Sequence, residues 1–235
     1  MGSKRYRQAK ATVDAEKSYA LDEAVGTLQQ MPGTKFDEAV EISVSLAIDA
    51  KKSDQVVRGT VMLPHGTGKT RRVIVFCKGE KELVAKEAGA DFAGGAELIN
   101  KVLGGWMDFD VAVATPDMMR DVSRLGKLLG PRGLMPNPKA GTVTDDVAKA
   151  VNDLRQGKVE FKMDKLSNIH FVIGRRSFAA DKLVENGRVA IEAILRARPS
   201  TLKGRMVRRM SLSSTMSPGI ALSTEGMDTV VAEDL

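Results

Sequence analysis

Apolar and polar residues alternate near the start of the chain in the pattern of a half-buried β-strand. At 40–48 every second residue is apolar, which is the period expected when one sheet face is buried and the other is exposed. The exposed positions are short and rich in hydroxyl groups, so a partner's backbone could approach them closely. A solvated antiparallel sheet accounts for the same pattern. A second strand is predicted at 58–63, ending at Pro64, and a helix at 21–30, closed by Met31, Pro32 and Gly33.

The same two-residue period returns after Gly157. Strands are predicted at 159–163 and 169–173, and the turn residues at 164–168 favour a hairpin between them. A long helix with a broad apolar stripe follows at 183–195 and ends before Pro199. The last predicted strand, 206–215, has two faces, one with Met206, Arg208, Met210 and Leu212, the other with Val207, Arg209, Ser211 and Ser213.

Between these segments the pattern changes to an alternation of apolar strands and helices. Strands are predicted at 73–77, 89–92 and 109–114, with helices at 80–88, 95–103 and 117–125. A further helix is predicted with Thr144 as its N-cap, an apolar stripe at Val147, Val151 and Leu154, and Gly157 at its end. Strands that are apolar on both faces are typical of a parallel sheet covered by helices on each side.

These patterns predict an α/β protein of two domains. The first is an α+β domain built from both termini, 1–66 and 158–235, and the second is a Rossmann-like βαβ domain inserted at 67–157. Two connections between domains favour a hinge-like pair. The acidic tail at 223–235 is expected to be flexible.

Charge is distributed unevenly along the chain. The 235 residues include 36 Lys and Arg against 30 Asp and Glu, a net charge of +6, and the cations cluster at 4–10, 120–139 and 196–209. Clustered cations at moderate net charge are typical of a protein that neutralises nucleic-acid phosphates, although a solvated basic surface has the same composition. No apolar run approaches a membrane span, and the N-terminus has no apolar segment of a signal peptide. We expect a cytoplasmic protein, monomeric when free, with no membrane partner.

Candidate chemistry is sparse. One cysteine and two histidines are too few for a structural zinc site, and ten aromatic residues are few for a surface that stacks several bases. The segment 66–70 resembles the end of a phosphate-binding P-loop, but Leu63 replaces the required glycine and a strand follows instead of a helix. The neighbouring acids at 108–110 and 145–146 read as structural, and His170 as a sheet-surface residue. We therefore expect no enzyme activity, catalytic residue, metal or cofactor.

The segment 125–143 is the most distinctive loop. It contains four glycines, three prolines and three cations, Lys127, Arg132 and Lys139, which predicts a rigid loop whose cations could meet phosphates. A long structured connection within the inserted domain is the alternative.

Six segments together resemble the bacterial form of the large-subunit ribosomal protein family L one. They are 34–38, 52–59, 63–68, 108–110 with 114–117, 129–142 and 214–216, and the run Gly130 to Lys139 is highly specific. The likeness covers about residues 4–222. It implies a two-domain fold with a Rossmann-like insertion, which agrees with the periodicity. It also implies binding to ribosomal RNA at the mobile stalk beside the tRNA exit site, assistance to deacylated tRNA movement and release, and repression of the protein's own operon through its mRNA.

The resemblance also implies a set of RNA-binding residues. Most lie in the first domain, with a second contact from the 130–141 loop; the set is Lys35, Phe36, Asp164, Lys165, His170, Ser211, Ser213, Thr215, Met216, Arg132 and Lys139. From sequence alone Phe36 and Met216 fit a core as well as a contact. The chain departs from the family pattern at Ser217, commonly glycine, and at Met163, commonly asparagine.

Three function classes are separable by experiment. RNA binding predicts an affinity that falls with salt, by about 0.7 to 0.9 log units per log unit of salt for each phosphate neutralised. An enzyme of the P-loop kind would bind ATP. A protein-interaction module would show little salt dependence and leaves the clustered cations unexplained.

Overall fold

The computed structural model describes residues 3–50, 55–202 and 204–225, and its architecture is α/β. The chain falls into two compact units: unit 1 comprises Met1–Gly68 and Val159–Leu235, and unit 2 comprises Lys69–Lys158. The junctions expected from the sequence were at 66–67 and 157–158. Most of the tail expected to be flexible, 226–235, lies outside the described residues, as does part of the 52–59 motif. None of the helices described is long and apolar enough to cross a membrane.

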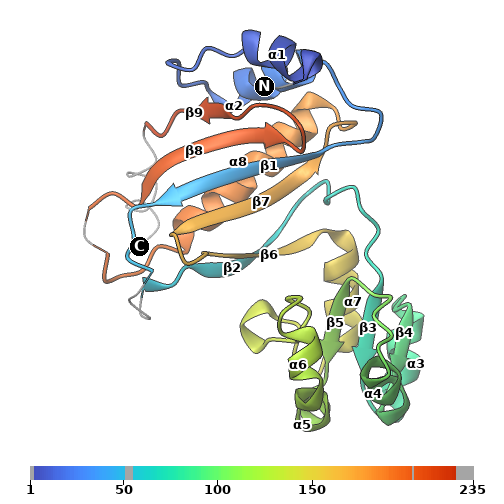
Figure 1. The fold of residues 1–235 in the computed structure, drawn as a ribbon. Coiled ribbons are helices and arrows are strands. Elements are labelled where there is room, and N and C mark those ends of the chain that lie inside the picture. Colours follow the sequence, from blue (N-terminus) through green and yellow to red (C-terminus); the bar gives the residue numbers. More distant parts are fainter. Residues whose placement is uncertain (1–2, 51–54, 203, 226–235) are drawn as a thin grey trace. The chain divides into compact units, whose positions relative to one another are not determined.

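Unit 1 is built on a four-stranded antiparallel sheet (Figure 1). Its strand order is β7 (Asn168–Arg175), β1 (Ala39–Leu46), β8 (Val207–Ser214) and β9 (Ile220–Leu222), so strands from both parts of the chain pair side by side. Two helices, α2 (Leu21–Gln30) and α8 (Ala180–Arg196), pack on one face of this sheet. The short helix α1 (Lys4–Ala11) precedes them.

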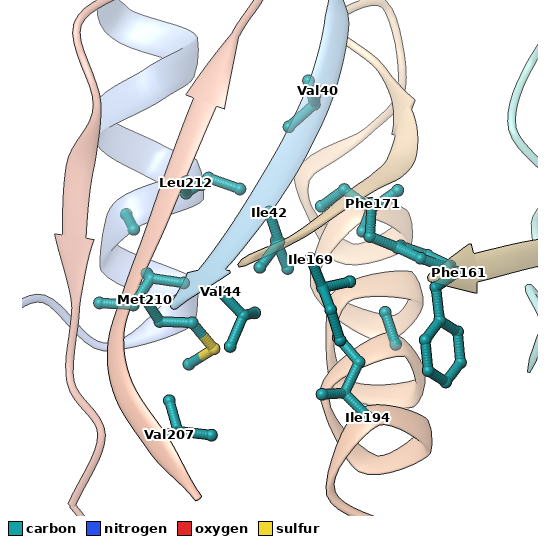
Figure 2. Packing of buried hydrophobic residues seen from close by; sticks show 14 of the residues in the cluster. Val40, Ile42, Val44, Phe161, Ile169, Phe171, Ile194, Val207, Met210 and Leu212 are labelled. Atoms are coloured by element: carbon teal, nitrogen blue, oxygen red, sulfur yellow. The ribbon is translucent and has the colours of Figure 1, made fainter. Parts of the chain in front are cut away.

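The core of unit 1 follows from the strand periodicity (Figure 2). Every second residue of β1 is buried, beginning with Val40, and Phe171 of β7 and Leu212 of β8 are buried beside them. Ile194 contributes the apolar side of α8. Because successive side chains of a strand point to opposite faces, burial of this set leaves the intervening residues of β1, β7 and β8 on the other face.

The predicted alternation of the last strand is wrong at its start. The prediction places Arg208 on the same face as Met210 and Leu212. In the structure Val207 is buried and Arg208 is exposed. The reason is an irregularity in the pairing with β1, where Ser45 lies opposite Arg209 but the next residue, Leu46, lies opposite Val207. The bulge shifts the phase of β8 by one residue, so both arginines are exposed.

The predicted hairpin between 159–163 and 169–173 is also wrong. β6 (Lys158–Lys162) pairs with β2 (Arg58–Met62) in a separate two-stranded sheet, whereas β7 joins the main sheet. The turn between them does form, because the Asp164 carboxylate accepts hydrogen bonds from the backbone N–H groups of Leu166 and Asn168. Ser167 adopts a positive φ of 64° there. The turn therefore directs the chain from one sheet to the other.

Unit 2 contains a parallel sheet in the order β4 (Phe92–Gly94), β3 (Val73–Phe76) and β5 (Val111–Ala114). Helices α3 (Glu80–Glu87) and α7 (Val147–Gln156) cover one face. The other face is covered by α4 (Ala96–Leu103) and by a series of short turns, η2 (Pro116–Met118), α5 (Met119–Val122), η3 (Ser123–Leu125) and α6 (Gly126–Leu129). The predicted parallel sheet with helices on both sides is confirmed.

Three details of unit 2 differ from the sequence prediction. The single helix expected at 117–125 is this series of short turns, and the strand expected at 89–92 is β4, a few residues later. The N-cap of α7 is Asp146, whose carboxylate accepts from the Lys149 N–H, whereas the Thr144 hydroxyl accepts from the Asp146 N–H. Thr144 therefore positions the capping residue instead of being the cap.

Candidate nucleic-acid interface

The face of the main sheet opposite the helices is polar, and we call it the outer face. The pairing register places its residues in three cross-strand rows: Ser43 lies opposite His170 and Ser211, Glu41 opposite Val172 and Ser213, and Ser45 opposite Asn168 and Arg209. Hydroxyl groups thus occupy the middle of the face, on the adjacent strands β1 and β8. His170 is exposed and its Nδ1 lies 3.1 Å from the Ser43 Oγ, which confirms the prediction of a sheet-surface histidine.

The outer face is hollowed. An open hollow of about 780 Å³ lies over the central strands and extends toward β9. Its polar lining includes Ser18, Ser45, Asn168, His170, Arg209 and Ser211. Neutral donors and acceptors together with two arginines, Arg208 and Arg209, suit a ligand that presents hydroxyl and phosphate groups.

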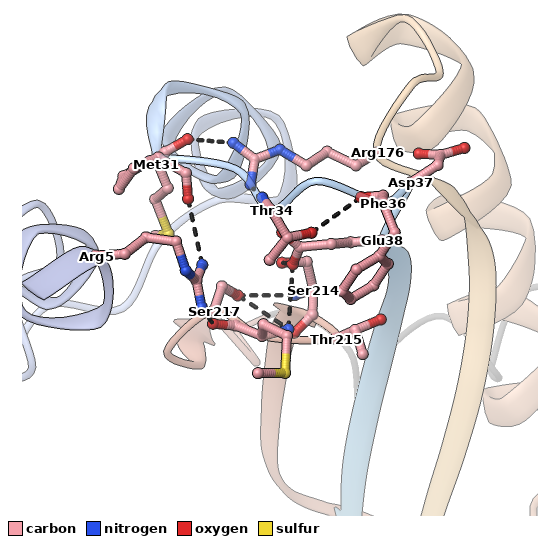
Figure 3. Close-up of polar contacts among 12 residues, drawn as sticks. Arg5, Met31, Thr34, Phe36, Asp37, Glu38, Arg176, Ser214, Thr215 and Ser217 are labelled. Carbon is pink, nitrogen blue, oxygen red and sulfur yellow. Dashed lines mark hydrogen bonds and ion pairs between the residues drawn. The ribbon is translucent and has the colours of Figure 1, made fainter. Parts of the chain in front are cut away.

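At one end of the outer face, a buried carboxylate joins the segment before β1 to the segment after β8 (Figure 3). Glu38 is fully buried, and its Oε2 accepts from the Ser214 hydroxyl and, at 3.1 Å, from the Met216 N–H. Its Oε1 accepts from the Thr34 N–H at 3.1 Å and lies 3.5 Å from Arg176 Nη1. One side chain therefore determines the shape of two loops that are distant in sequence.

The surroundings of Glu38 keep it ionised. Burial opposes ionisation, but the hydrogen bonds from Ser214, from the Met216 N–H and from Thr34 outweigh it and lower the pKa of the carboxyl below 4.5. Arg176 also donates to the Met31 carbonyl, and Arg5 of α1 donates to the Met216 carbonyl at 2.8 Å. Two cations thus tie the neighbouring helices to the same loops.

The loops held by Glu38 expose two large apolar side chains. Phe36 is 54% exposed and Met216 is 49% exposed, so neither belongs to the core. Lys35 is exposed beside Phe36. Thr215 extends the pairing of β8 with β1, because its N–H donates to the Ala39 carbonyl and its Oγ accepts from the Ala39 N–H, both at 3.0 Å. Thr215 thus positions the exposed methionine.

The remaining predicted residues of unit 1 lie elsewhere on the outer face. Ser211 and Ser213 line its middle, and Asp164 and Lys165 lie at the opposite end of the sheet from Phe36, next to the start of β7. The Asp164 carboxylate is occupied by the turn, and its pKa is lowered by the hydrogen bond from the Asn168 N–H. Lys165 is exposed. The predicted set therefore extends along the whole sheet, about 25 Å for an eight-residue strand.

Arg132 and Lys139 lie in unit 2, on the glycine- and proline-rich loop. Both are exposed, and Gly133 and Gly141 adopt positive φ angles of 69° and 67°. Thr142 closes the loop, since its hydroxyl accepts from the Asn137 N–H at 2.8 Å and its carbonyl accepts from the N–H of Ala114, the last residue of β5. The loop is therefore held to the parallel sheet and keeps its cations exposed.

The P-loop-like segment has a structural role. Lys69 Nζ donates to Asp110 Oδ1 at 2.8 Å, and this bond, with the Arg72 N–H, lowers the pKa of Asp110 to about 2. Arg72 also pairs with Asp108, so these two acids are structural, as predicted. The buried Cys77 thiol has a raised pKa, mainly because of burial. Among the described residues, no group of three His, Cys, Asp or Glu side chains is arranged to hold a metal ion.

Sequence reasoning missed part of the interface. Ser43 and Ser45 follow from the hydroxyl-rich polar face of the predicted strand, which the list of RNA contacts did not use. Arg209 was placed on the correct face by the alternation. Glu38 lies in the segment 34–38 and Arg5 in the cation cluster 4–10, but the sequence did not indicate that either side chain holds loops, because an acid before a strand and a base in a polar helix are ordinary surface residues.

The fold and the site define an α/β protein with a polar, hollowed sheet face. The family described as the ribosomal protein L1p/L10e family matches residues 28–218. Proteins named large ribosomal subunit protein uL1 are similar over nearly the whole chain: 56% identical in Pseudarthrobacter chlorophenolicus, over 94% of each chain, and 54% identical in Streptomyces griseus subsp. griseus, over 99% of this chain and 97% of the relative.

The relative from Kosmotoga olearia is 55% identical, over 94% of this chain and 95% of its own. The chain therefore belongs to the ribosomal protein L1p/L10e family, a family of structural, non-enzymatic ribosomal proteins. The resemblance based on the sequence motifs is confirmed.

Proposed function

We propose that this protein is a constituent of the large ribosomal subunit that binds ribosomal RNA through the outer face of unit 1. The observation that carries the proposal is the arrangement of exposed Phe36 and Met216, held by buried Glu38, at the end of a row of sheet hydroxyls. Membership of a ribosomal protein family and the chemistry of this surface both support ribosomal RNA as the partner.

In the proposed contact, the protein recognises the RNA by its shape. Exposed Phe36 and Met216 pack on ribose or base faces, and the hydroxyls of Ser211, Ser213 and Thr215 exchange hydrogen bonds with 2′-hydroxyl groups or sugar oxygens. Phosphates pair with Lys35 at one end of the sheet and with Lys165 at the other. His170 lies between them, and the turn formed by Asp164 holds the end that carries Lys165.

The family resemblance extends the proposal to three further roles. The RNA site is the mobile stalk beside the tRNA exit site, where the protein assists deacylated tRNA to move and leave. The same surface binds a similar structure in the mRNA of the protein's own operon and represses its translation. In this proposal the protein acts in the cytoplasm on the ribosome, and the loop with Arg132 and Lys139 makes a second, weaker RNA contact.

Binding of purified large-subunit ribosomal RNA to site variants tests the proposal. Met216→Asp places a negative charge against phosphates, and Thr215→Ala removes the bonds that position Met216; each is expected to weaken binding by at least about tenfold, or about 1.4 kcal/mol. Lys139→Ala is expected to weaken it mildly. Filter binding gives the affinity, and circular dichroism shows whether the variant is folded.

A matched control is Leu83→Asp, the same type of change at a 65% exposed apolar residue of α3. It is expected to bind like the wild-type protein. Native spectra with unchanged affinity for both Met216→Asp and Thr215→Ala would refute the assignment.

A further inference from the structure

A strongly charged surface on unit 2 has no role in the function proposed above. It lies on the short turns η2, α5, η3 and α6, which cover one face of the parallel sheet. The apolar side of these turns is buried in the core of unit 2, at positions spaced four, three and four residues apart, Met118, Val122, Leu125 and Leu129. This spacing is that of one side of a helix, so the run is amphipathic although it is broken into short turns.

The other side of the same turns carries three cations, which we call the basic stripe: Arg120, Arg124 and Lys127. All three are exposed, and their spacing of four and three residues aligns them along one side. With a rise of 1.5 to 2.0 Å per residue, the stripe extends about 11 to 14 Å. Cations repeated along a line suit a ligand whose negative charges also repeat along a line.

The charge of the basic stripe is not cancelled within the protein. In the part of the chain that the structure describes, none of its three residues forms an ion pair. The acids of unit 2 that do form ion pairs do so with other cations, namely Asp91 with Arg155, Asp108 and Asp110 with Arg72, Asp110 with Lys69, Asp121 with Lys78, Asp145 with Lys81 and Asp153 with Lys158. Unit 2 therefore leaves these three cations available while it neutralises others.

We propose that the basic stripe is a further RNA-binding surface, separate from the loop with Arg132 and Lys139, which holds the sugar–phosphate backbone without selecting bases. Guanidinium groups donate paired hydrogen bonds to phosphate oxygens, and two arginines on a backbone fixed by a buried apolar side are well placed to do so. The stripe exposes no aromatic side chain for base stacking, and Leu128 is the single large exposed apolar residue within these turns. The inference rests on the proposed function, because it concerns the same RNA partner.

The test measures the salt dependence of RNA binding by the full-length protein. The variant Arg120→Gln, Arg124→Gln, Lys127→Gln removes the stripe, and large-subunit ribosomal RNA is the probe. The matched control is Lys81→Gln, Lys86→Gln, Lys149→Gln, which removes the same charge from α3 and α7 on the opposite face of unit 2. Affinities are measured from 50 to 400 mM salt, a range of about an order of magnitude over which screening changes strongly.

The expected result is a specific loss of phosphate contacts. The slope of log affinity against log salt should become shallower by about 2 to 3 for the stripe variant, 0.7 to 0.9 for each cation, with a loss of affinity on the order of tenfold at low salt. The control variant should keep the wild-type slope. An equal change of slope in both variants would overturn the proposal, because a general charge effect would then explain it.

Met216→Asp, measured in parallel, separates the two proposals. If the stripe variant binds like the wild-type protein while Met216→Asp loses binding, the inference fails and the proposed function survives. If Met216→Asp binds like the wild-type protein, the proposed function itself fails. A stripe variant that binds RNA normally but no longer joins ribosomal particles would indicate an acidic protein partner, and this also overturns the inference.

A tethered cleavage reagent gives an independent measurement. Ser123, exposed next to the stripe, is replaced by cysteine and labelled with an iron chelate that cleaves nearby RNA; buried Cys77 is protected from labelling. Exposed Glu87 of α3, replaced in the same way, is the control. RNA cleavage from position 123 but not from position 87 is expected, and cleavage from neither position would contradict the proposal.

Discussion

At the scale of single residues, the outer face depends on a carboxylate that never reaches its surface. The Glu38 carboxylate accepts four hydrogen bonds, one of them from the Arg176 guanidinium, and because it is buried the loss of any of them lowers stability. The exposed positions of Phe36 and Met216 follow from these bonds, since both residues lie next to the donors. The residues that form the contact surface are therefore different from the residue that determines its shape.

Glu38→Gln tests this dependence. The amide keeps the shape but loses the charge, and one acceptor becomes an N–H donor facing the Ser214 hydroxyl and the Met216 N–H. We expect a loss of about 1 to 3 kcal/mol in the free energy of unfolding, measured with urea at pH 7. Glu41→Gln, half-exposed on the adjoining strand β1, is the control and is expected to change stability by less than about 0.5 kcal/mol.

The difference in stability between the wild-type protein and Glu38→Gln is expected to depend on pH. The pKa of Glu38 is lower in the folded protein than its ordinary value of 4.5, so ionisation stabilises the folded state above that pH. This contribution is lost as the pH falls through the folded pKa. The stability difference between the wild-type protein and Glu38→Gln should therefore be largest near pH 6 and should narrow below pH 4.5. A difference that grows on acidification would contradict the assigned direction.

Asp110 offers a second titration at the residue scale. Its pKa of about 2 is caused first by the Lys69 ammonium and then by the Arg72 N–H. Lys69→Met should raise the pKa of Asp110 toward its ordinary value of 3.8, observed by carbon NMR of the side-chain carboxyl group. No change in the titration would show that Lys69 does not control this acid, and Lys86→Met, distant in sequence, serves as the reference.

At the scale of elements, the connection that leaves unit 1 is fixed by one side chain of α8. Asn186 is fully buried, and its amide donates to the carbonyls of Gly66 and Ile173 while its oxygen accepts from the His65 N–H at 3.1 Å. His65 Nε2 also lies 2.6 Å from a carboxylate oxygen of Glu185. Hydrogen bonds to α8 therefore hold the segment that follows β2 at His65 and Gly66, close to the point where the chain leaves unit 1.

Asn186→Ala is expected to be among the more damaging polar substitutions in the chain. It leaves three backbone groups without partners, and each such loss costs about 1 to 3 kcal/mol when the group remains buried. We expect a decrease of at least about 2 kcal/mol in the free energy of unfolding, measured by urea denaturation. Asn152→Ala, on the exposed side of α7, should have little effect; an equally small effect at Asn186 would contradict the role described.

At the scale of the whole molecule, long periodic elements were predictable and short or irregular ones were not. The helix 21–30 and the strand beginning at Val40 follow directly from their apolar spacing. The helix α1 was missed because it buries only Ala9, and β9 because it has three residues. The phase error in β8 arises from a bulge opposite Ser45, which depends on pairing between distant segments and leaves no local pattern.

The candidate interface was also predictable from the sequence only in part. The resemblance supplied Phe36 and Met216, but the sequence could not decide between core and contact. Their exposure shows that neither belongs to the core. The charge cluster at 120–139 was visible in sequence. Its division into a buried apolar side and an exposed basic side was not, because the prediction treated 117–125 as one helix and 125–143 as a loop.

Removal of unit 2 is the corresponding whole-molecule test. Unit 1 is assembled from both ends of the chain, so joining Gly68 to Val159 through a short glycine linker keeps its sheet and helices. We expect the joined protein to fold and to retain RNA binding, with a shallower salt slope because the cations of unit 2 are gone. A joined protein with a native circular dichroism spectrum that does not bind the RNA would contradict the assignment of the main contact to unit 1.

The central position of β1 between β7 and β8 has a consequence for protein synthesis. β1 emerges from the ribosome early, but one of its neighbours begins more than 120 residues later and the other more than 160 residues later. All strands of unit 2 are translated before either partner of β1 exists. A chain that ends before β8 therefore has no complete outer face. Under the proposed function, such a nascent or prematurely terminated copy would not compete with finished protein for RNA.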